Sequence, residues 1–410
     1  MSMTTKDDVL SPQVFIEHIK GHFKNKPVFV NSPLVTGGAV IIDGNMVIPG
    51  TKSTAVGKTV DVPYFGLIGD FADNPDGSSV TPGKLSQTSE QATVSRQSLA
   101  VEASAWSQGV LATNPNLGNL MDEATRQAEE AVQRMMSKAI VTAISTTPLV
   151  NDKYSSGSPS YISYDDIIDA TSMWGDEQDD IVGLVAHSQV RADLAKLKDS
   201  TGKPLLLTSM NQGPGQMMTF AGIPILLSNS VPLTGSTPGA VTSTGTSPPV
   251  CTLAGTPLGA WKLHIDCQAS HASTTTVKFS TDNGKTWSAA ITVADDSVPV
   301  ALIDTTVDSL VGKNGLTGLT AAFAAGDFNV DNLWKSTMNL KATTLILQKG
   351  AAAFYYSADH LVPKTDVDIL ADSDILAMHC YHVAHMYRRR RGGSYPGVVA
   401  LQTNVTGYIG

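Results

Sequence analysis

The sequence predicts an α+β fold that is interrupted by an all-β insertion. Three observations carry this prediction: residues 117–146 have helical periodicity, strand-like segments rich in Val, Thr and aromatic residues flank that run, and the composition changes abruptly at 233–250. At 410 residues the chain is long enough for two or three compact domains with cores of their own.

Composition limits the function classes. The chain is 42% hydrophobic but 16% charged, below the usual quarter, which suits a protein that covers its surface with partners. A net charge of −9 argues against a dedicated nucleic-acid binder. No apolar run approaches the roughly 20 residues that span a bilayer, and the first residues lack the features of a secretory signal. The odd, sparse cysteines (Cys251, Cys267 and Cys380) indicate reduced, intracellular synthesis.

The first 110 residues predict a short helix and a long arm. Ser11 and Pro12 supply an N-cap and an N1 proline for an amphipathic helix. Lys58–Gly66 and Ala92–Trp106 have strand composition, and the turn-rich stretch between them predicts a two-stranded arm with a polar tip. Since an isolated two-stranded ribbon is marginal in water, we expect this arm to lie on a partner surface.

A helix at 117–146 is the strongest local signal. Its length is roughly 45 Å at about 1.5 Å per residue, long for a globular protein. Asp122 and Glu123 near its start and Lys138 near its end agree with the helix dipole. The predicted apolar stripe steps by three or four through Leu117, Leu120, Ala124, Ala128, Ala131, Met135, Ala139 and Ala143.

The remaining segments alternate in type. We expect a capped helix at Ser163–Trp174, a strand and then a helix at Asp180–Ser200, and a strand at Phe220–Pro232. In 233–250, fourteen of eighteen residues are Thr, Ser, Gly or Pro, which is typical of a linker. The sequence then has strand composition from Cys251 to about Ser336. Globular sequence like that before the linker resumes at Ala342–Ser357.

This order of parts resembles tailed-phage major capsid proteins, which have the Hong Kong 97-like fold. The resemblance covers about 10–232 and 341–410 and is carried by "VDVPYFG", "VSRQSLAVEASAW", "LVAHSQVRADLAKLKD", the "FAGIP" strand start and the late "LILQKGAAAF" strand. It implies an N-terminal arm at 1–46, an extended loop at 47–108, a peripheral domain at 109–180 with its spine helix at 117–146, an axial domain at 181–232, a linker and inserted β-sandwich (Ig-like) module at 233–340, and the remainder of the axial and peripheral domains at 341–410.

The resemblance also implies a function without catalysis and without a cofactor. Copies of such a protein form hexamers and pentamers of an icosahedral shell around double-stranded DNA, which they contact non-specifically, in a virion assembled in the host bacterial cytoplasm. The expected partners are a separate scaffolding protein, a portal, decoration proteins and no membrane. Two alternatives stay open: an encapsulin-like nanocompartment shell, and a carbohydrate-binding or glycan-cleaving protein built on 251–336.

The second alternative comes from "STDNGKTW" at 280–287, which resembles the Asp-box hairpin of sialidases. Asp282, Gly284 and Trp287 are expected to hold a structural turn of the inserted module, since Asn283 and Gly284 readily take positive φ. A propeller would repeat the motif in each blade, and one copy is present. Glycoside hydrolysis needs two carboxylates about 5 to 9 Å apart, whereas the pairs Asp165-Asp166 and Asp295-Asp296 are merely adjacent.

Two further motifs predict little. Gly57-Lys58-Thr59 suggests a P-loop, but six residues separate Gly50 from Gly57 where the motif needs four, and a strand with Pro63 follows. A zinc site is suggested by His379, Cys380, His382 and His385. Their spacing by three would bring the histidines together only on a helix, whereas the local sequence favours a strand. We expect satisfied or surface histidines.

Basic residues leave two interpretations open. The run Arg388, Arg389, Arg390 and Arg391 predicts either a solvated turn with inter-subunit ion pairs, for example to Asp374 or Glu129, or a point that faces DNA or an acidic scaffold. Some relatives crosslink a loop lysine to a neighbour. Lys58 and Lys84 are available for this, but the sequence identifies no matching partner residue.

Overall fold

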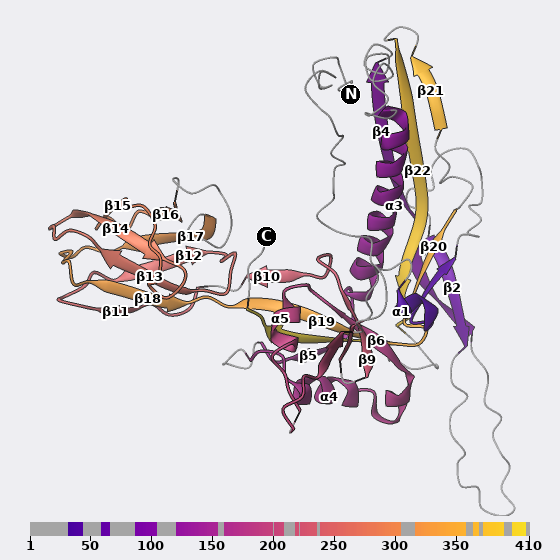
Figure 1. Ribbon diagram of the computed structural model, residues 1–410, viewed down its shortest axis with the longest axis horizontal. Helices are drawn as coiled ribbons and strands as arrows, with labels where there is room; N and C mark the ends of the chain where they lie inside the picture. Colours follow the sequence, from indigo (N-terminus) through magenta and orange to yellow (C-terminus); the bar gives the residue numbers. More distant parts are fainter. Residues whose placement is uncertain are drawn as a thin grey trace, which may run out of the picture. The chain divides into compact units, whose positions relative to one another are not determined.

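The structure is a computed structural model (Figure 1). It describes the following residues: 32–43, 59–65, 87–104, 120–154, 160–199, 201–208, 218–220, 222–235, 238–304, 316–357, 364–368, 372–388 and 396–406. The chain divides into two compact units. The first comprises the residues up to Leu149 with Trp174–Gly183 and Ile346–Val399, and the second comprises Val150–Met173, Leu184–Leu345 and the residues from Ala400. The predicted helix after Ser11 lies outside the described residues.

The first unit combines one long helix with a five-stranded sheet. Helix α3 (Leu120–Ile144) lies along the sheet built from β1 (Val40–Asp43), β20 (Ala352–Tyr356), β22 (Ser373–Met386), β21 (Lys364–Asp368) and β4 (Ser95–Ser104). A four-residue helix, α1 (Pro33–Thr36), precedes β1. The buried side chains of α3 include Met136, Ile140, Val141 and Ile144.

The predicted stripe of α3 is therefore displaced by about one residue from the face that is buried. Of the predicted positions, Ala128 is buried, whereas Ala131, Met135, Ala139 and Ala143 are half-buried. The physical reason is side-chain size, because Met and Ile remove more apolar area from water than Ala does and so turn their own face toward the sheet. The helix itself is where the periodicity predicts it.

The predicted arm is paired differently from the expectation. Strand β2 (Thr59–Phe65) pairs antiparallel with β3 (Gln87–Thr93), from Thr59 opposite Thr93 to Phe65 opposite Gln87. The prediction of one strand over Ala92–Trp106 is wrong: the strand breaks at Val94, and β4 after it pairs with β22 instead. Val94 is buried with Ala92 against Val383, and this anchor separates the two strands.

An eight-stranded mixed sheet has the order β5-β23-β19-β6-β9-β8-β7, with β10 paired to β19. Its strands are β5 (Leu149–Asp152), β6 (Ile181–Ala186), β7 (Leu206–Thr208), β8 (Met218–Phe220), β9 (Ile223–Leu227), β10 (Leu233–Gly235), β19 (Leu340–Gln348) and β23 (Val398–Asn404). The expected Phe220–Pro232 strand begins at β9, after Gly222 turns the chain with φ of +87°.

Short helices accompany this sheet. Helix α4 (Tyr164–Ser172) begins at the capping box of Ser163 and Asp166, in which each side chain bonds the other's backbone N–H. A 3₁₀ segment, η2 (Gly175–Asp180), leads into the buried strand β6, and α5 (Val190–Leu194) follows β6. The strand-then-helix prediction for Asp180–Ser200 agrees with this order.

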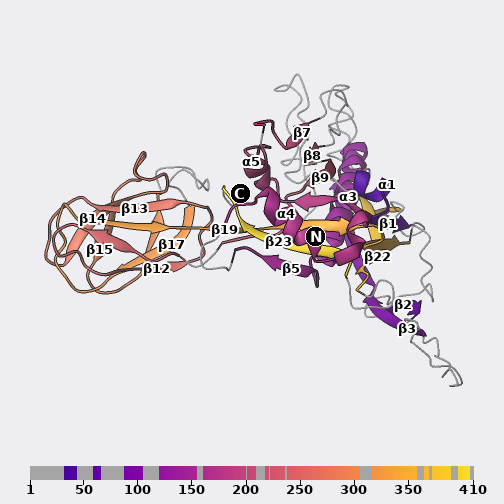
Figure 2. The same cartoon turned by 90° about the horizontal axis from the view of Figure 1, so that it is seen from below.

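The part of the chain between β10 and β19 forms two further sheets. One has the order β11-β18-β13-β14-β15 and the other β12-β17-β16. Figure 2 labels β13, β14 and β15 of the first sheet and β12 and β17 of the second. The strands are β11 (Thr242–Thr244), β12 (Cys251–Gly255), β13 (Lys262–Cys267), β14 (Thr274–Ser280), β15 (Ile291–Ala294), β16 (Val300–Ile303), β17 (Leu316–Phe323) and β18 (Leu333–Thr337). We call the described residues 238–338 the β-module.

The stretch 233–250 is not a linker throughout. Leu233–Gly235 pair with Leu340–Ala342, so the chain enters and leaves the β-module at adjacent strands of another sheet. Thr242–Thr244 pair with β18 at the edge of the module. Threonine supplies β propensity here, and a count of turn-forming residues does not detect it.

Candidate functional site

Strand β22 presents two different faces. From Ile375 to His382, half-buried and buried side chains alternate: Leu376, Met378 and Cys380 are buried on the face that lies toward α3. The alternate residues, Ile375, Ala377, His379 and Tyr381, are half-buried on the other face. The period of two is that of a strand, and it divides the sheet into a helix-covered side and a more open side.

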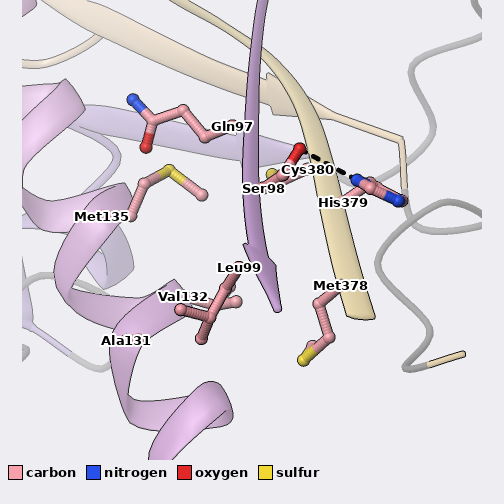
Figure 3. Close-up of a pocket in the computed structure, with 9 residues that line it drawn as sticks. All are labelled: Gln97, Ser98, Leu99, Ala131, Val132, Met135, Met378, His379 and Cys380. Carbon is pink, nitrogen blue, oxygen red and sulfur yellow. Dashed lines mark hydrogen bonds between the residues drawn. The ribbon is translucent and has the colours of Figure 1, made fainter. Parts of the chain in front are cut away.

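On the helix side, an apolar pocket of about 190 Å³ lies between α3, β4 and β22 (Figure 3). Leu99 is 40% exposed there, an unusual position for a leucine next to three further apolar side chains, Val132, Met135 and Met378. The remaining lining residues are Gln97, Ser98, Ala131, His379 and Cys380. Burial raises the pKa of the Cys380 thiol to about 11, so it is protonated near neutral pH and contributes as a small apolar group.

The base of the β2–β3 ribbon is tied to the end of β22. Glu90 Oε2 lies 2.9 Å from His385 Nε2, and both side chains are largely buried. The same oxygen accepts the backbone N–H of Arg388 at 3.3 Å. A polar pocket of about 160 Å³ lies beside this contact and is lined by Gln91, Ala92, Thr93, Ala143, Thr146, Thr147, Ala384, His385, Met386 and Arg388.

The histidines of β22 are separated rather than gathered. His382 is buried and stacks on Phe354 with ring centroids 5.2 Å apart, and burial lowers its pKa. His379, on the other face, has Nδ1 2.9 Å from Ser98 Oγ and 3.4 Å from an Arg96 nitrogen. Within the described ranges, no group of three His, Cys, Asp or Glu side chains is arranged to hold a metal ion.

Of the four consecutive arginines, the structure describes the first, Arg388. Arg388 is exposed, two residues after the end of β22, while Arg389, Arg390 and Arg391 lie outside the described residues. Of the two predicted acidic partners, Asp374 is half-buried in β22 and Glu129 is exposed on α3. Lys58 and Lys84, considered for crosslinking, also lie outside the described residues, as does the P-loop-like stretch before Thr59.

In the β-module, the turn after β14 is held by one carboxylate. Asp282 accepts the backbone N–H groups of Lys285 and Thr286 at 3.0 and 2.9 Å and the hydroxyls of Thr286 and Ser280 at 2.8 and 2.7 Å. Burial alone would raise its pKa, but these hydrogen bonds outweigh burial and lower the pKa to about 2. Asn283 and Gly284 have φ of +65° and +83°, and Trp287 is 39% exposed.

The paired aspartates also hold local structure. Asp166 is buried in the capping box of α4, while its neighbour Asp165 is exposed. Asp295 accepts the N–H of Gly326 at 3.5 Å, and Asp296 accepts the N–H of Val298 at 2.9 Å. Neither adjacent pair is arranged as two carboxylates across a cleft.

Sequence reasoning missed the pocket and the Glu90–His385 contact. The pocket depends on β4 lying beside β22, a pairing of strands about 270 residues apart that no local pattern specifies. The available signal was the apolar Leu99, which directly follows four polar residues in "SRQSLA".

No helix among the described residues is long and apolar enough to cross a membrane.

Residues 113–244 match the model of the phage capsid family. The match includes α3, α4, β6 and β9, and it confirms the resemblance to phage capsid proteins predicted from the sequence. No protein in a search of curated sequences matches this chain.

Solved structures of shell proteins resemble the chain distantly. The capsid of an empty GTA particle has a TM-score of 0.48 at 9% identity, over 97% of this chain and 96% of that one. The match to Mycobacterium phage Che8 has a TM-score of 0.44 at 11% identity, over 95% and 96%. The SrpI encapsulin of Synechococcus elongatus has a TM-score of 0.39 at 12% identity, over 79% and 80%.

Proposed function

We propose that this chain is the major capsid protein of a tailed bacteriophage and that its copies assemble into an icosahedral head shell around double-stranded DNA. The observation that carries the proposal is the phage capsid family match over 113–244, which contains the long helix α3. The proposed function is structural, and no catalytic step or cofactor is assigned to it.

Two features of the first unit support assembly. The β2–β3 ribbon is a two-stranded sheet among the described residues, and such a ribbon is marginal in water without a further surface. The pocket beside α3 leaves apolar side chains such as Leu99 accessible to solvent. Burying this apolar area against another copy would contribute about 25 cal/mol per Å².

The finer architecture belongs to the same proposal. We assign α3 as the spine helix of a Hong Kong 97-like peripheral domain, the β2–β3 ribbon as part of the extended loop, and the β-module as an inserted domain. Hexamers and pentamers then arise from heterologous contacts that close by rotation. A separate scaffolding protein, a portal and non-specific contact with DNA complete the expected set of partners.

The test is electron microscopy of the protein produced in bacteria, after fractionation by sedimentation. Closed icosahedral shells, or rings of five and six subunits, are the expected result. Soluble monomers alone, found again when candidate scaffolding proteins are co-produced, would contradict the proposal. Faithful shells formed by this chain alone would retain the capsid function and remove the scaffolding protein from it.

A further inference from the structure

The five-stranded sheet of the β-module has an inner and an outer face with different chemistry. Its inner face supplies Leu263, Ile265, Phe279 and Trp334 to the core. The alternating residues point outward, and the outer face carries Lys262, His264, Asp266, Thr276, Lys278, Lys335 and Thr337. Leu333, opposite Asp266, is the apolar member of the outward rows of β13, β14 and β18, and the residues named above are polar.

Trp287 is exceptional among the aromatic side chains of the β-module. Trp261, Phe279, Phe323, Phe328 and Trp334 are all at most 8% exposed, whereas Trp287 is 39% exposed. The core already contains a packed aromatic group, with Phe323 and Trp334 ring centroids 4.8 Å apart. The indole of Trp287 is therefore free of a core role and offers an apolar surface to a ligand.

The turn after β14 places this indole on the outer face. A Cβ at Gly284 would lie 3.3 Å from Nδ1 of His264 and 3.6 Å from Cζ2 of Trp287, so both rings border the same small space. His264 lies opposite Lys335 on β18 and opposite Ser280 on β14. The turn that follows Ser280 therefore lies over the outward-facing side chains of the sheet. Glycine keeps the space between the two rings open.

The lysines and the aspartates of the β-module lie in different places. All four lysines of its described part lie on the outer face or on the turn: Lys262, Lys278, Lys285 and Lys335. Most of its aspartates, in contrast, hold loops: Asp295, Asp296, Asp304 and Asp331 accept backbone N–H groups there. A chain with a net charge of −9 thus gathers lysines around its exposed tryptophan.

We propose that this outer face, centred on Trp287, His264 and Lys335, binds an acidic polysaccharide whose pyranose rings carry carboxylates. The indole takes the apolar face of a sugar ring, the lysines pair with the carboxylates, and His264 and the threonines offer hydrogen bonds to hydroxyl groups. Burial, and then the nearby Lys335, lower the pKa of His264, so the imidazole is neutral and suits a hydroxyl partner.

Two observations separate this site from other uses of the same surface. The described β-module contains no arginine, the residue that best pairs with phosphate, and this disfavours nucleic acid as the ligand. Asp282 already accepts four hydrogen bonds that hold the turn and is not available as a catalytic carboxylate. The site is one of binding without cleavage.

The experiment is binding of the full-length protein to three immobilised polymers at low salt: polygalacturonate, uncharged dextran and single-stranded oligo-dT. We expect polygalacturonate to bind most tightly and to be released as salt rises, because exposed charges are screened. Trp287→Ala is expected to weaken binding on the order of tenfold, equivalent to about 1.4 kcal/mol, and Lys335→Gln several-fold. Trp287→Tyr retains a ring and is expected to retain most of the binding.

Matched controls make the outcome decisive. Val330→Ala removes another exposed apolar group of the β-module, and Lys203→Gln removes an exposed lysine outside it. Both are expected to bind as the unchanged protein does, and all variants are checked for an unchanged unfolding temperature. The proposal is overturned if the unchanged protein does not bind polygalacturonate, if dextran or oligo-dT binds as tightly, or if Trp287→Ala binds normally.

Discussion

The sheet beside α3 and the β-module are both antiparallel in most of their pairings, yet they bury their side chains in different ways. The β-module places two sheets face to face, and the fifteen buried residues of its core come from both. In the first unit, β22 packs one face against α3, and its other face is half-buried from Ile375 to Tyr381. Even the helix side has an open apolar pocket beside Leu99.

The difference in burial indicates that the β-module completes its own core, whereas the sheet beside α3 does not. A sandwich of two sheets satisfies its apolar faces internally, whereas a sheet with one helix retains apolar surface that another surface can cover. The β-module therefore resembles an independently stable unit. The first unit has the properties expected of a protein whose remaining contacts come from assembly. The predictions below test this contrast, ordered by the size of the expected effect on the stability of the subunit.

The largest effect is expected for Trp334→Ala in the core of the β-module. The indole is 1% exposed, packs against Phe323 and Phe328, and donates Nε1–H to Pro249 O at 2.8 Å. Truncation leaves a cavity and is expected to cost about 3–5 kcal/mol. Hydrogen exchange of the β13 and β14 amides measures it, with Trp287→Ala as the matched control. Equal exchange rates in the two variants would show that the core does not depend on Trp334.

A smaller effect is expected for Glu90→Ala at the base of the β2–β3 ribbon. The change leaves the buried His385 and the N–H of Arg388 without their carboxylate partner, at a cost of about 1–3 kcal/mol. Hydrogen exchange of the β2 and β3 amides is expected to become faster while that of α3 stays the same. Glu90→Gln retains an acceptor oxygen and serves as the control. If Glu90→Ala leaves the β3 amides as protected as before, another contact holds the ribbon.

Asp282→Asn in the turn of the β-module is expected to cost about 1 kcal/mol, because the amide keeps one acceptor oxygen of the two. The pH dependence is the sharper measurement. The folded-state pKa of Asp282 is lowered to about 2 from the ordinary 3.8, so its contribution is complete above about pH 4 and is lost as pH falls through about 2. The difference in unfolding temperature between the two proteins should shrink over this range. A difference that is constant with pH would mean that the ionised carboxylate does not stabilise the turn.

The sequence predicted the elements that local chemistry determines. The helical periodicity of α3, the capped helix at Ser163–Trp174 and the strand composition from Cys251 to about Ser336 each depend on residues that are near one another in the chain. Positive φ at Asn283 and Gly284 follows from the residue types at the turn.

What sequence reasoning could not supply depends on pairing between distant segments. The assignment of β4 to the ribbon failed because β4 has the composition of a strand whichever partner it takes, and β22 lies about 270 residues further along the chain. The displaced face of α3 has a different origin, because Met136 and Ile140 are larger than the alanines of the predicted stripe and their size decides which face is buried. The exposed Trp287 was expected to support its turn, and its accessibility depends on how the turn lies over His264.

The smallest effect on folding, and the clearest test of the contrast, is expected for Leu99→Asp. Leu99 is 40% exposed at the pocket beside α3, so a charge there should change the stability of the isolated subunit by less than about 1 kcal/mol. In an assembled shell the same charge would be buried against a neighbour without a partner, and we expect the yield of shells to fall more than tenfold. Sedimentation followed by electron microscopy measures the yield.

Ser95→Asp is the matched control for this change. It adds the same charge to the same face of β4, at an exposed position that does not line the pocket. Normal shells from Ser95→Asp and few from Leu99→Asp would assign the pocket to an interface between copies. If Leu99→Asp assembles as well as Ser95→Asp, the pocket stays open to solvent in the shell. The apolar surface that drives assembly must then lie elsewhere on the first unit, with the more open face of β22 as the next surface to substitute.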